Sequence, residues 1–401
     1  MPPDAQSGSR AEGRLPVVLP LYGGFFFLGI ATVMLGVLLP GIAAQHHLSD
    51  SQSGALLTTQ FTASACGALF VRRRFAQTLL RGYLLMAAGA ATLAGASRME
   101  ALTAIALFSL GLGMAMTSSS LLVGKIFCRS RGSAMSILNL SWSIGATLCP
   151  IILARLSSRF SLRELCIWLA VLSTALGLAI WPAVSASSSL PAPPGTGTVG
   201  QRSWIPILLF SGLAFLYVGT ESTLGGWMTT YAARTLHWSV GGDNLAAACF
   251  WGAILLGRGV TPLILKFADE VRLHRCAIAG ALAGILLLLE AHGPLALLAG
   301  ACFSGLMLGP IFPLTVSLSI DQAGDSANVG WVFAIAGFGA AAFPWAAGAV
   351  SSAAHSLRIG LLVTVLSAAG MLLLALQGVP LRAGDSRSHR TRSDSPIPLR
   401  D

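Results

Sequence analysis

The stretch SASSSLPAPPGTGTVGQRS, residues 185–203, divides this 401-residue chain into two halves. Its serine, proline, glycine and threonine residues cannot form a hydrophobic core, so the segment is predicted to be a flexible connector. Across the whole chain, 54% of the residues are hydrophobic and only 10% are charged. Such a composition lies outside the range of soluble globular proteins. The chain is therefore predicted to be an all-α integral membrane protein, with one group of spans on each side of the connector.

Twelve apolar segments are of a length that can cross a bilayer as helices, since about 20 residues span roughly 30 Å of hydrocarbon. Six precede the connector and six follow it. The predicted spans are residues 17–40, 54–71, 82–97, 100–124, 132–155, 164–184, 204–231, 242–266, 272–291, 294–318, 328–352 and 355–378. The predicted organisation is a leader at 1–16, a six-helix bundle at 17–184, the connector at 185–203, a second six-helix bundle at 204–378 and a disordered tail at 379–401.

The basic residues indicate how the spans are oriented. Lys and Arg collect in cytoplasmic loops, and with an internal N-terminus those loops receive most of them, including the run Arg72–Arg74. Both termini are therefore predicted to be cytoplasmic. The leader carries Arg10 and Arg14 as a signal peptide would, but the apolar stretch after it is too long for one. We expect a multi-pass protein of the cytoplasmic membrane, in bacteria the inner membrane.

Charge, cysteine and histidine placement argue against several other classes of protein. The net charge of +10 arises from residues that flank spans, where they set topology and attract anionic lipid, so no nucleic-acid partner is expected. The seven cysteines have no CxxC spacing, and the seven histidines lie in loops, at span ends or in the tail. No metal site, cofactor or enzyme active site is therefore predicted. The expected partners are membrane lipids and a small-molecule substrate, and the chain is expected to be a monomer.

One acidic residue lies inside an apolar segment. The stretch YVGTESTLGGWMTTY, Tyr217–Tyr231, carries Glu221 within the predicted seventh span. A carboxylate at membrane depth costs about 2.5–3.5 kcal/mol on insertion scales, so Glu221 is expected to face the bundle interior or a wet cavity. There it either carries a proton or joins neighbouring helices by hydrogen bonds. Arg258 is the second charge within a span, and it either pairs with Glu221 or reaches the cytoplasm or backbone carbonyls.

Glycine and proline mark candidate gating positions. Gly225 and Gly226, followed by Trp227, predict a local unwinding of the seventh span near its external end, with close helix packing as the alternative. Pro310 and Pro313 remove two backbone donors from the tenth span. The freed carbonyls are expected either to bind substrate hydroxyls or only to bend the helix.

Polar and aromatic residues within the spans supply the candidate binding groups. A sugar needs amides or hydroxyls for its own hydroxyl groups and a flat aromatic face for its C–H patches. Asn139 and Trp142 fall one helical turn apart on the fifth span. The candidates of this kind are Gln60, Asn139, Trp142, Trp251, Asn328 and Trp331.

Four stretches of the second half resemble a known family. Their order and spacing are similar to the seventh, eighth, tenth and eleventh spans of the fucose-permease-like branch of the major facilitator superfamily. They are YVGTESTLGGWMTTY at 217–231, CFWGAILLGR at 249–258, GLMLGPIFP at 305–313 and GFGAAAFPWAAG at 337–348. The resemblance implies two six-helix bundles that rock around a central cavity, sugars or related metabolites as substrates, and protons as the coupling ion.

One stretch departs from the family pattern. The loop after the second span reads GALFVRRRF, with Val71 where the superfamily signature has an acid. Proton coupling would then rest on Glu221. The sequence therefore favours a secondary active transporter that moves a small polar solute by alternating access. The alternatives left open are an exporter of neutral or amphiphilic compounds, a uniporter and a membrane sensor that does not transport.

Overall fold

A computed structural model describes residues 15–71, 74–95, 98–127, 131–187, 204–236, 243–323 and 326–378 of the chain. Within these ranges the secondary structure consists of α-helices, α2 to α14, without strands. Most of the predicted connector and all of the predicted tail lie outside the described residues. The predicted leader, 1–16, also lies outside them except for its last two residues.

The helices follow the predicted spans one for one. Their bounds are α2 Leu15–His46, α3 Asp50–Leu69, α4 Phe75–Leu93, α5 Arg98–Ile126, α6 Arg131–Ser157, α7 Leu162–Ser187, α8 Trp204–Leu236, α9 Asp243–Ile264, α10 Glu270–Leu289, α11 Pro294–Ala323, α12 Ser326–Ala354, α13 Leu357–Gly360 and α14 Leu362–Gly378. The short α13 and α14 adjoin at Leu361 and together occupy the predicted twelfth span.

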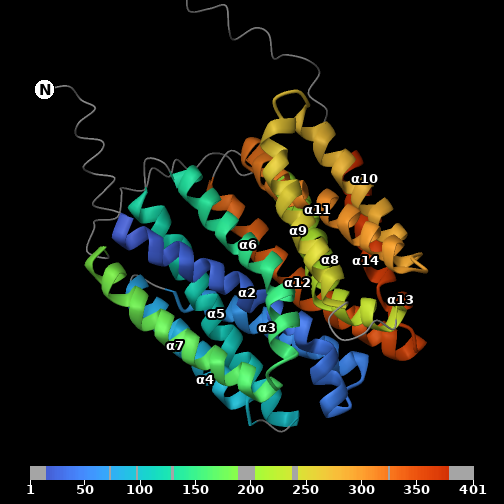
Figure 1. Cartoon of the computed structure of the whole chain (residues 1–401). Helices are drawn as coiled ribbons and strands as arrows, with labels where there is room; N and C mark the ends of the chain where they lie inside the picture. Colours follow the sequence, from blue (N-terminus) through green and yellow to red (C-terminus); the bar gives the residue numbers. More distant parts are fainter. Residues whose placement is uncertain are drawn as a thin grey trace, which may run out of the picture.

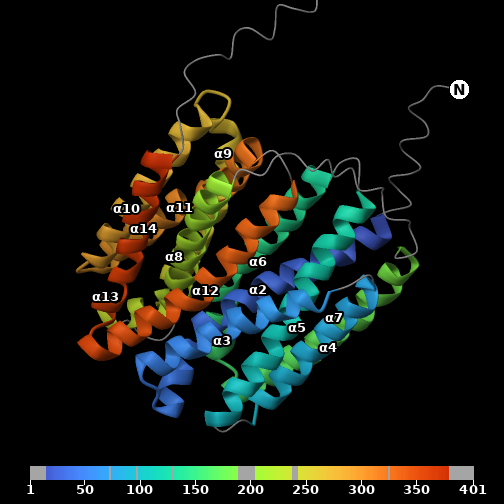
Figure 2. The same cartoon turned by 180° about the vertical axis from the view of Figure 1, so that it is seen from behind.

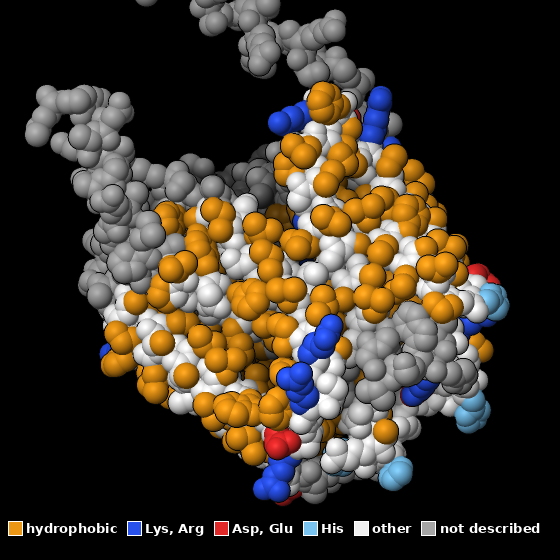
Figure 3. Space-filling view, in the orientation of Figure 1, with side chains coloured by type: hydrophobic (Ala, Val, Ile, Leu, Met, Phe, Trp, Pro, Cys, Tyr) orange, Lys and Arg blue, Asp and Glu red, His pale blue; other side chains and the backbone are white. Residues whose placement is uncertain are grey.

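Ten of the twelve helical segments in the described ranges are long and apolar enough to cross a membrane. The other two, α3 and α4, are more polar. Serine, threonine and glutamine recur along α3, and α4 contains Gln77 and Arg81. Large apolar side chains, among them Trp168 on α7 and Leu366 on α14, are exposed on the flanks of the molecule. Figure 3 shows these apolar flanks, which suit contact with lipid.

The helices form two bundles, α2–α7 and α8–α14, that lean against each other (Figures 1 and 2). The start of α2, the end of α7, the start of α8 and the end of α14 lie toward the same end of the molecule; in Figure 1 this end faces the upper left for the tilted first bundle and the top for the second. We call this the terminal end and the opposite one the closed end. The halves contact each other through α3 with α12, α6 with α9, and α2 with α8.

Glycines bring α2 and α8 into close contact at the junction of the two halves. A Cβ on Gly36 of α2 would lie 2.9 Å from the Cα of Gly226, and a Cβ on Gly226 would lie 2.9 Å from Leu57 of α3. Helix α8 runs without interruption through this point, so the unwinding predicted at Gly225 and Gly226 is wrong. Close approach of backbones, the alternative for small residues in a membrane, explains the pair instead.

An ion pair joins the halves at the closed end. Ser49 caps α3 by accepting a hydrogen bond from the backbone N–H of Gln52, so that Asp50 lies in the first turn of the helix. The guanidinium of Arg234, near the end of α8, donates two hydrogen bonds to the Asp50 carboxylate, at 2.7 and 2.6 Å. The hydroxyl of Ser351 on α12 donates to the same carboxylate. We call Asp50, Arg234 and Ser351 the latch.

Further hydrogen bonds between the halves extend from the latch toward the middle of the molecule. The backbone N–H of Ser51 donates to the hydroxyl of Ser352 at 2.8 Å. The hydroxyl of Thr58 donates to the carbonyl of Ala341 at 2.5 Å. These hydrogen bonds, like the latch, connect α3 of one half with α12 of the other. Along α3 and α12, the halves are therefore closed on each other from the latch to about mid-depth.

Candidate functional site

A cavity of about 130 Å³ lies between the two halves, next to the glycine contact. It is lined by side chains from α2, α3 and α6 of the first half and from α8 and α9 of the second. These are Thr32, Val33, Gly36, Leu57, Gln60, Phe61, Trp142, Val218, Glu221, Ser222, Gly225, Gly226 and Trp251. Four predicted binding candidates, Gln60, Trp142, Glu221 and Trp251, thus line one space.

The carboxylate on the cavity wall is paired with the arginine of α9. A guanidinium N–H of Arg258 donates to Oε1 of Glu221 at 2.7 Å, and the same nitrogen lies 3.4 Å from the hydroxyl of Tyr217. The two charged side chains are 24% and 14% exposed, respectively. Of the three arrangements that the sequence left open for Arg258, the structure has the direct pair. Each charge thereby offsets the cost of placing the other inside the bundle.

Glycines in α9 and α11 fix where Arg258 lies. A Cβ on Gly257 would clash with the carbonyl oxygen of Leu306, and a Cβ on Gly309 would lie 2.9 Å from the backbone nitrogen of Arg258. On the other side of the pair, the ring of Tyr217 stacks on Phe312 of α11 with centroids 5.6 Å apart. Helix α11 therefore supports both α9 and α8 beneath the ion pair.

A substitution at Gly257 tests this packing. Gly257→Val is expected to lower the melting temperature of the purified protein, because overpacking a close contact typically costs about 1–3 kcal/mol. Gly259→Val is the matched control, since a Cβ at Gly259 meets no atom within 4 Å. Equal melting temperatures for the two variants would contradict the close contact of α9 with α11.

Two tryptophans and an amide complete the cavity wall. The rings of Trp142 and Trp251 meet edge to face across the two halves, with centroids 5.9 Å apart. The indole N–H of Trp142 donates to the hydroxyl of Thr32 at 3.3 Å, and the amide of Gln60 donates to the carbonyl of Thr32 at 2.6 Å. Flat apolar rings beside hydrogen-bonding groups are typical of sites for small polar molecules.

Several predicted residues do not line this cavity. Asn139 donates its amide hydrogen to the Met135 carbonyl of its own helix, at 3.0 Å. Trp227 donates its indole N–H to the carbonyl of Pro344 at 3.1 Å, within the second half. Pro310 is buried and Pro313 is exposed within an α11 that continues through both. The side chains of the two remaining candidates, on the first turns of α12, lie outside the described residues; they are Asn328 and Trp331.

Sequence reasoning missed four residues that the structure brings to functional positions. Thr32 and Tyr217 hold the cavity wall and the ion pair, while Asp50 and Arg234 form the latch. Tyr217 could have been noticed, because it lies four positions before Glu221 and thus one helical turn away. Nothing in the local sequence pairs Asp50 with Arg234.

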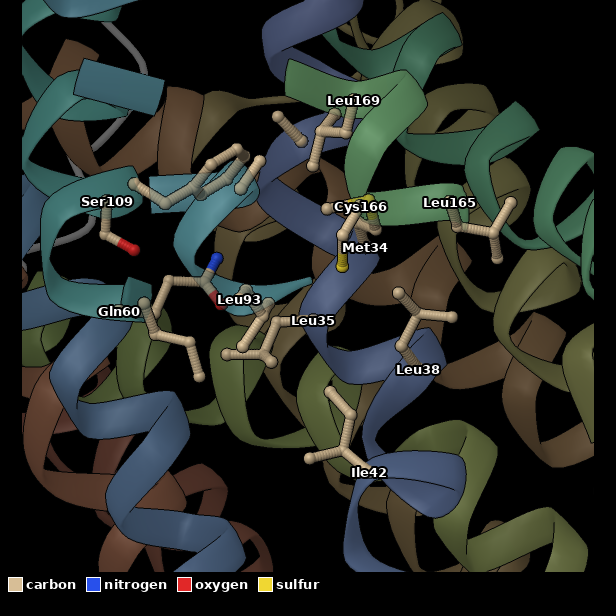
Figure 4. Close-up of a pocket in the computed structure, with 14 residues that line it drawn as sticks. Met34, Leu35, Leu38, Ile42, Gln60, Leu93, Ser109, Leu165, Cys166 and Leu169 are labelled. Atoms are coloured by element: carbon tan, nitrogen blue, oxygen red, sulfur yellow. The ribbon is translucent and has the colours of Figure 1, made fainter. Parts of the chain in front are cut away.

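A second, smaller cavity of about 40 Å³ lies within the first half (Figure 4). Apolar side chains of α2, α4, α5 and α7 make up most of its wall. Figure 4 shows the amide of Gln60 and the hydroxyl of Ser109 facing this space, opposite the sulfur atoms of Met34 and Cys166. Gln60 belongs to the walls of both cavities, so the two spaces lie on either side of this side chain.

Metal binding has no structural support in the described part of the chain. Its His, Cys, Asp and Glu residues form no group of three or more that could hold a metal ion. Among the described residues that line the central cavity, Glu221 carries the charge, and Arg258 of α9 pairs with it. These two groups can bind a proton, an ion or a polar solute.

The comparison of the sequence with protein families decides the family. The pattern of the Major Facilitator Superfamily matches residues 21–328, which is most of the chain. The chain belongs to the Major Facilitator Superfamily. The predicted membership of this superfamily and the predicted fold, twelve helices in two six-helix bundles, are thereby confirmed. A comparison with curated protein sequences gives no significant match.

Solved structures of superfamily transporters share the fold. A bacterial homologue of the human lysosomal transporter Spinster, inward-facing and occupied, aligns with a TM-score of 0.69 and 14% identity, over 90% of this chain and 95% of that one. A variant of the E. coli fucose:proton symporter FucP aligns with a TM-score of 0.59 and 16% identity, over 90% of this chain and 97% of that one. FucP in the outward conformation gives 0.58 and 17%, with the same coverage. Identities this low show similarity of fold alone.

Proposed function

We propose that this protein is a secondary active transporter that moves a small polar solute, a sugar or a related metabolite, by alternating access. Membership of the superfamily supports membrane transport in general. The observation that carries the proposal is the cavity at the junction of the halves, with the Glu221 carboxylate on its wall. A site between two rigid bundles can face one side of the membrane and then the other when the bundles rock.

The latch suggests which state of the cycle this is. We take both termini to be cytoplasmic, in the inner membrane of a bacterium, because most basic residues lie in loops on that side. The latch then lies at the external end. Its ion pair and the hydrogen bonds beneath it close the halves toward the outside. In this assignment the structure corresponds to an inward-facing state.

Proton coupling is assigned to Glu221. Its carboxylate lies on the cavity wall, and Arg258 is its ion-pair partner among the described side chains. Protonation removes the negative charge and weakens the pair, so a proton taken up outside and released inside changes the interaction between α8 and α9. The proton then moves with the solute, as symport requires.

Transport can be tested without knowing the solute in advance. Purified protein is screened by thermal shift against sugars, nucleosides, amino acids and amphiphiles. Each compound that stabilises it is tested for counterflow and for uptake driven by a pH gradient in proteoliposomes. Accumulation of at least one compound, with exchange against unlabelled compound inside, is expected. Binding without any movement across the membrane would support a sensor instead, and movement that never responds to the gradient would support a uniporter.

The cavity of Figure 4 favours a second candidate function, the export of neutral or amphiphilic compounds. Its wall is largely apolar, and Gln60 separates it from the central cavity, whose wall carries Glu221. An amphiphile could place its polar group beside Glu221 and its apolar part in this space. A screen in which compounds with longer alkyl chains stabilise the protein more, while sugars do not, would favour the exporter.

A further inference from the structure

The two ion pairs on α8 differ in how fully their charges are satisfied. At the latch, both terminal nitrogens of Arg234 donate to Asp50, and Ser351 adds a third hydrogen bond to the carboxylate. At the cavity, Arg258 donates to Glu221 through one nitrogen only. A guanidinium has five N–H donors in a planar fork that fits a carboxylate through two parallel hydrogen bonds. The other N–H donors of the Arg258 guanidinium are therefore not used by Glu221.

Those spare donors have no other protein partner in the part of the chain that the structure describes. Within the described part of the chain, the remaining contact of the Arg258 guanidinium is the hydroxyl of Tyr217, which shares the nitrogen that binds Glu221. About a quarter of the side chain is exposed. Trp251 lies seven positions earlier in α9, about two helical turns away and on the same face. The aromatic wall of the cavity and the free face of the guanidinium therefore lie along one side of α9.

The charges around Glu221 can balance one additional anion only when Glu221 is neutral. Helices α2, α9, α11, α12 and α14 pack against α8. In the described ranges, α12 and α14 contain no ionisable side chain. On the other three helices and on α8 itself, the titratable groups are Tyr22, His46, Tyr217, Tyr231, Arg234, Asp243, Cys249, Arg258, Cys302 and Asp321. Of these, Tyr217 and Arg258 contact Glu221 or its partner. The site is thus neutral with Glu221 ionised and carries one positive charge with Glu221 protonated.

We propose that the transported solute is a small monocarboxylate, which takes the place of Glu221 as the partner of Arg258 when Glu221 is protonated. This inference rests on the proposed function. One proton binds the Glu221 carboxylate, and the neutral acid releases Arg258. The solute carboxylate then accepts two parallel hydrogen bonds from the guanidinium N–H groups of Arg258. On the other side of the membrane the solute leaves, Glu221 loses the proton and the ion pair forms again. One proton and one anion cross together, so no net charge moves.

The first test is binding of paired ligands that differ only in charge. Lactate is compared with lactamide, and gluconate with gluconamide, by thermal shift at several pH values. The carboxylates are expected to bind at least about tenfold more tightly than the amides, with affinity falling as the pH rises. Equal or tighter binding of the amides, or no binding by any carboxylate, would overturn the inference. A neutral sugar that binds and is transported would leave the proposed function standing.

The second test is the driving force. In proteoliposomes, uptake of the carboxylate is expected to follow an imposed pH gradient and to be unaffected by a potassium-diffusion potential set with valinomycin. Symport of a neutral solute with a proton would instead respond to both. Uptake that follows the potential therefore overturns electroneutral symport of a proton with an anion, but leaves transport itself standing.

Variants distinguish the role of the Glu221 carboxylate, which binds the proton, from that of the solute carboxylate, which binds Arg258. Glu221→Gln is expected to bind lactate with an affinity that no longer depends on pH, because residue 221 is then neutral at every pH and its amide oxygen holds Arg258 less strongly than a carboxylate does. Arg258→Met is expected to lose lactate binding while retaining the fold, which thermal unfolding checks. Glu290→Gln is the matched control, since Glu290 also pairs with an arginine, Arg358, but lies between α10 and α11 away from the cavity. A pH dependence that persists in Glu221→Gln would contradict the proposal.

Discussion

Replacing Asp50 by asparagine is expected to open the closed end and to shift the transporter toward its outward-facing state. Two charge-assisted hydrogen bonds from Arg234 hold Asp50, and the pair is partly exposed, with Arg234 47% and Asp50 12% exposed. Partial exposure limits such a pair to about 1–2 kcal/mol. That difference changes the ratio of the two states by a factor of roughly 5–30.

The shift can be measured from outside the membrane. Ser222→Cys places a thiol on the wall of the central cavity, in a chain whose native cysteines are replaced. Labelling by an impermeant thiol reagent added externally is expected to be faster with Asp50→Asn than with native Asp50. Glu290→Gln, which removes the exposed pair with Arg358, serves as the control and is expected to change nothing. Unchanged labelling in Asp50→Asn would mean that the latch does not hold the halves together.

A charge exchange tests whether the pair itself is responsible. Asp50→Arg combined with Arg234→Asp keeps one charge of each sign at the latch. The double variant is expected to restore slow external labelling, whereas either single variant labels fast because like charges then meet. Failure of the exchange to restore slow labelling would assign the effect to Ser351 or to the helix end rather than to the ion pair.

Replacing Glu221 by glutamine is expected to abolish uptake driven by a pH gradient while leaving exchange of solute intact. Glutamine keeps the size of the glutamate side chain and a hydrogen-bond acceptor for Arg258, but its neutral amide cannot take up and release a proton as a carboxylate does. The rate of gradient-driven accumulation is therefore expected to fall at least about tenfold, and counterflow is expected to persist. Uptake that still follows the proton gradient at full strength would show that Glu221 is not the carrier.

Folding has to be checked separately in this variant. Removing one partner of a buried pair leaves the other charge uncompensated and typically costs about 3–5 kcal/mol. The double variant Glu221→Gln, Arg258→Met removes both charges and is expected to melt closer to the native protein than Glu221→Gln does. Both variants are expected to lack proton-driven uptake, so loss of coupling and loss of stability can be told apart.

Hydropathy was sufficient to predict the helices, because each span is a local run of apolar residues. Their ends were predicted less well. Helix α2 continues to His46 rather than residue 40, and α4 begins at Phe75 rather than residue 82. Hydropathy marks the part of a helix that lies in hydrocarbon, whereas the helix itself extends into the interface, where polar residues such as Gln77 are tolerated.

Contacts between the halves could not be predicted, because they join residues far apart in the chain. Asp50 and Arg234 are separated by 184 positions, and each alone resembles an ordinary charged residue at a helix end. Gly225 and Gly226 fit either unwinding or close packing until their neighbour Gly36 is known. Glu221 and Arg258 were predictable as candidates because an intramembrane charge is costly, but their pairing depends on how α8 and α9 pack.

The central claim is that the two halves close on each other at one end and part at the other in alternation. Spin-label distances test it directly, with one label pair at Gln45 and Ala353 near the closed end and another at Leu69 and Phe267 near the terminal end, all exposed positions. In the resting protein, the first pair is expected to give a short, narrow distance distribution and the second a long one. Addition of a transported solute with a pH gradient is expected to lengthen the first distance and shorten the second. If both distances stay fixed, or if both change in the same direction, alternating access between these halves is contradicted.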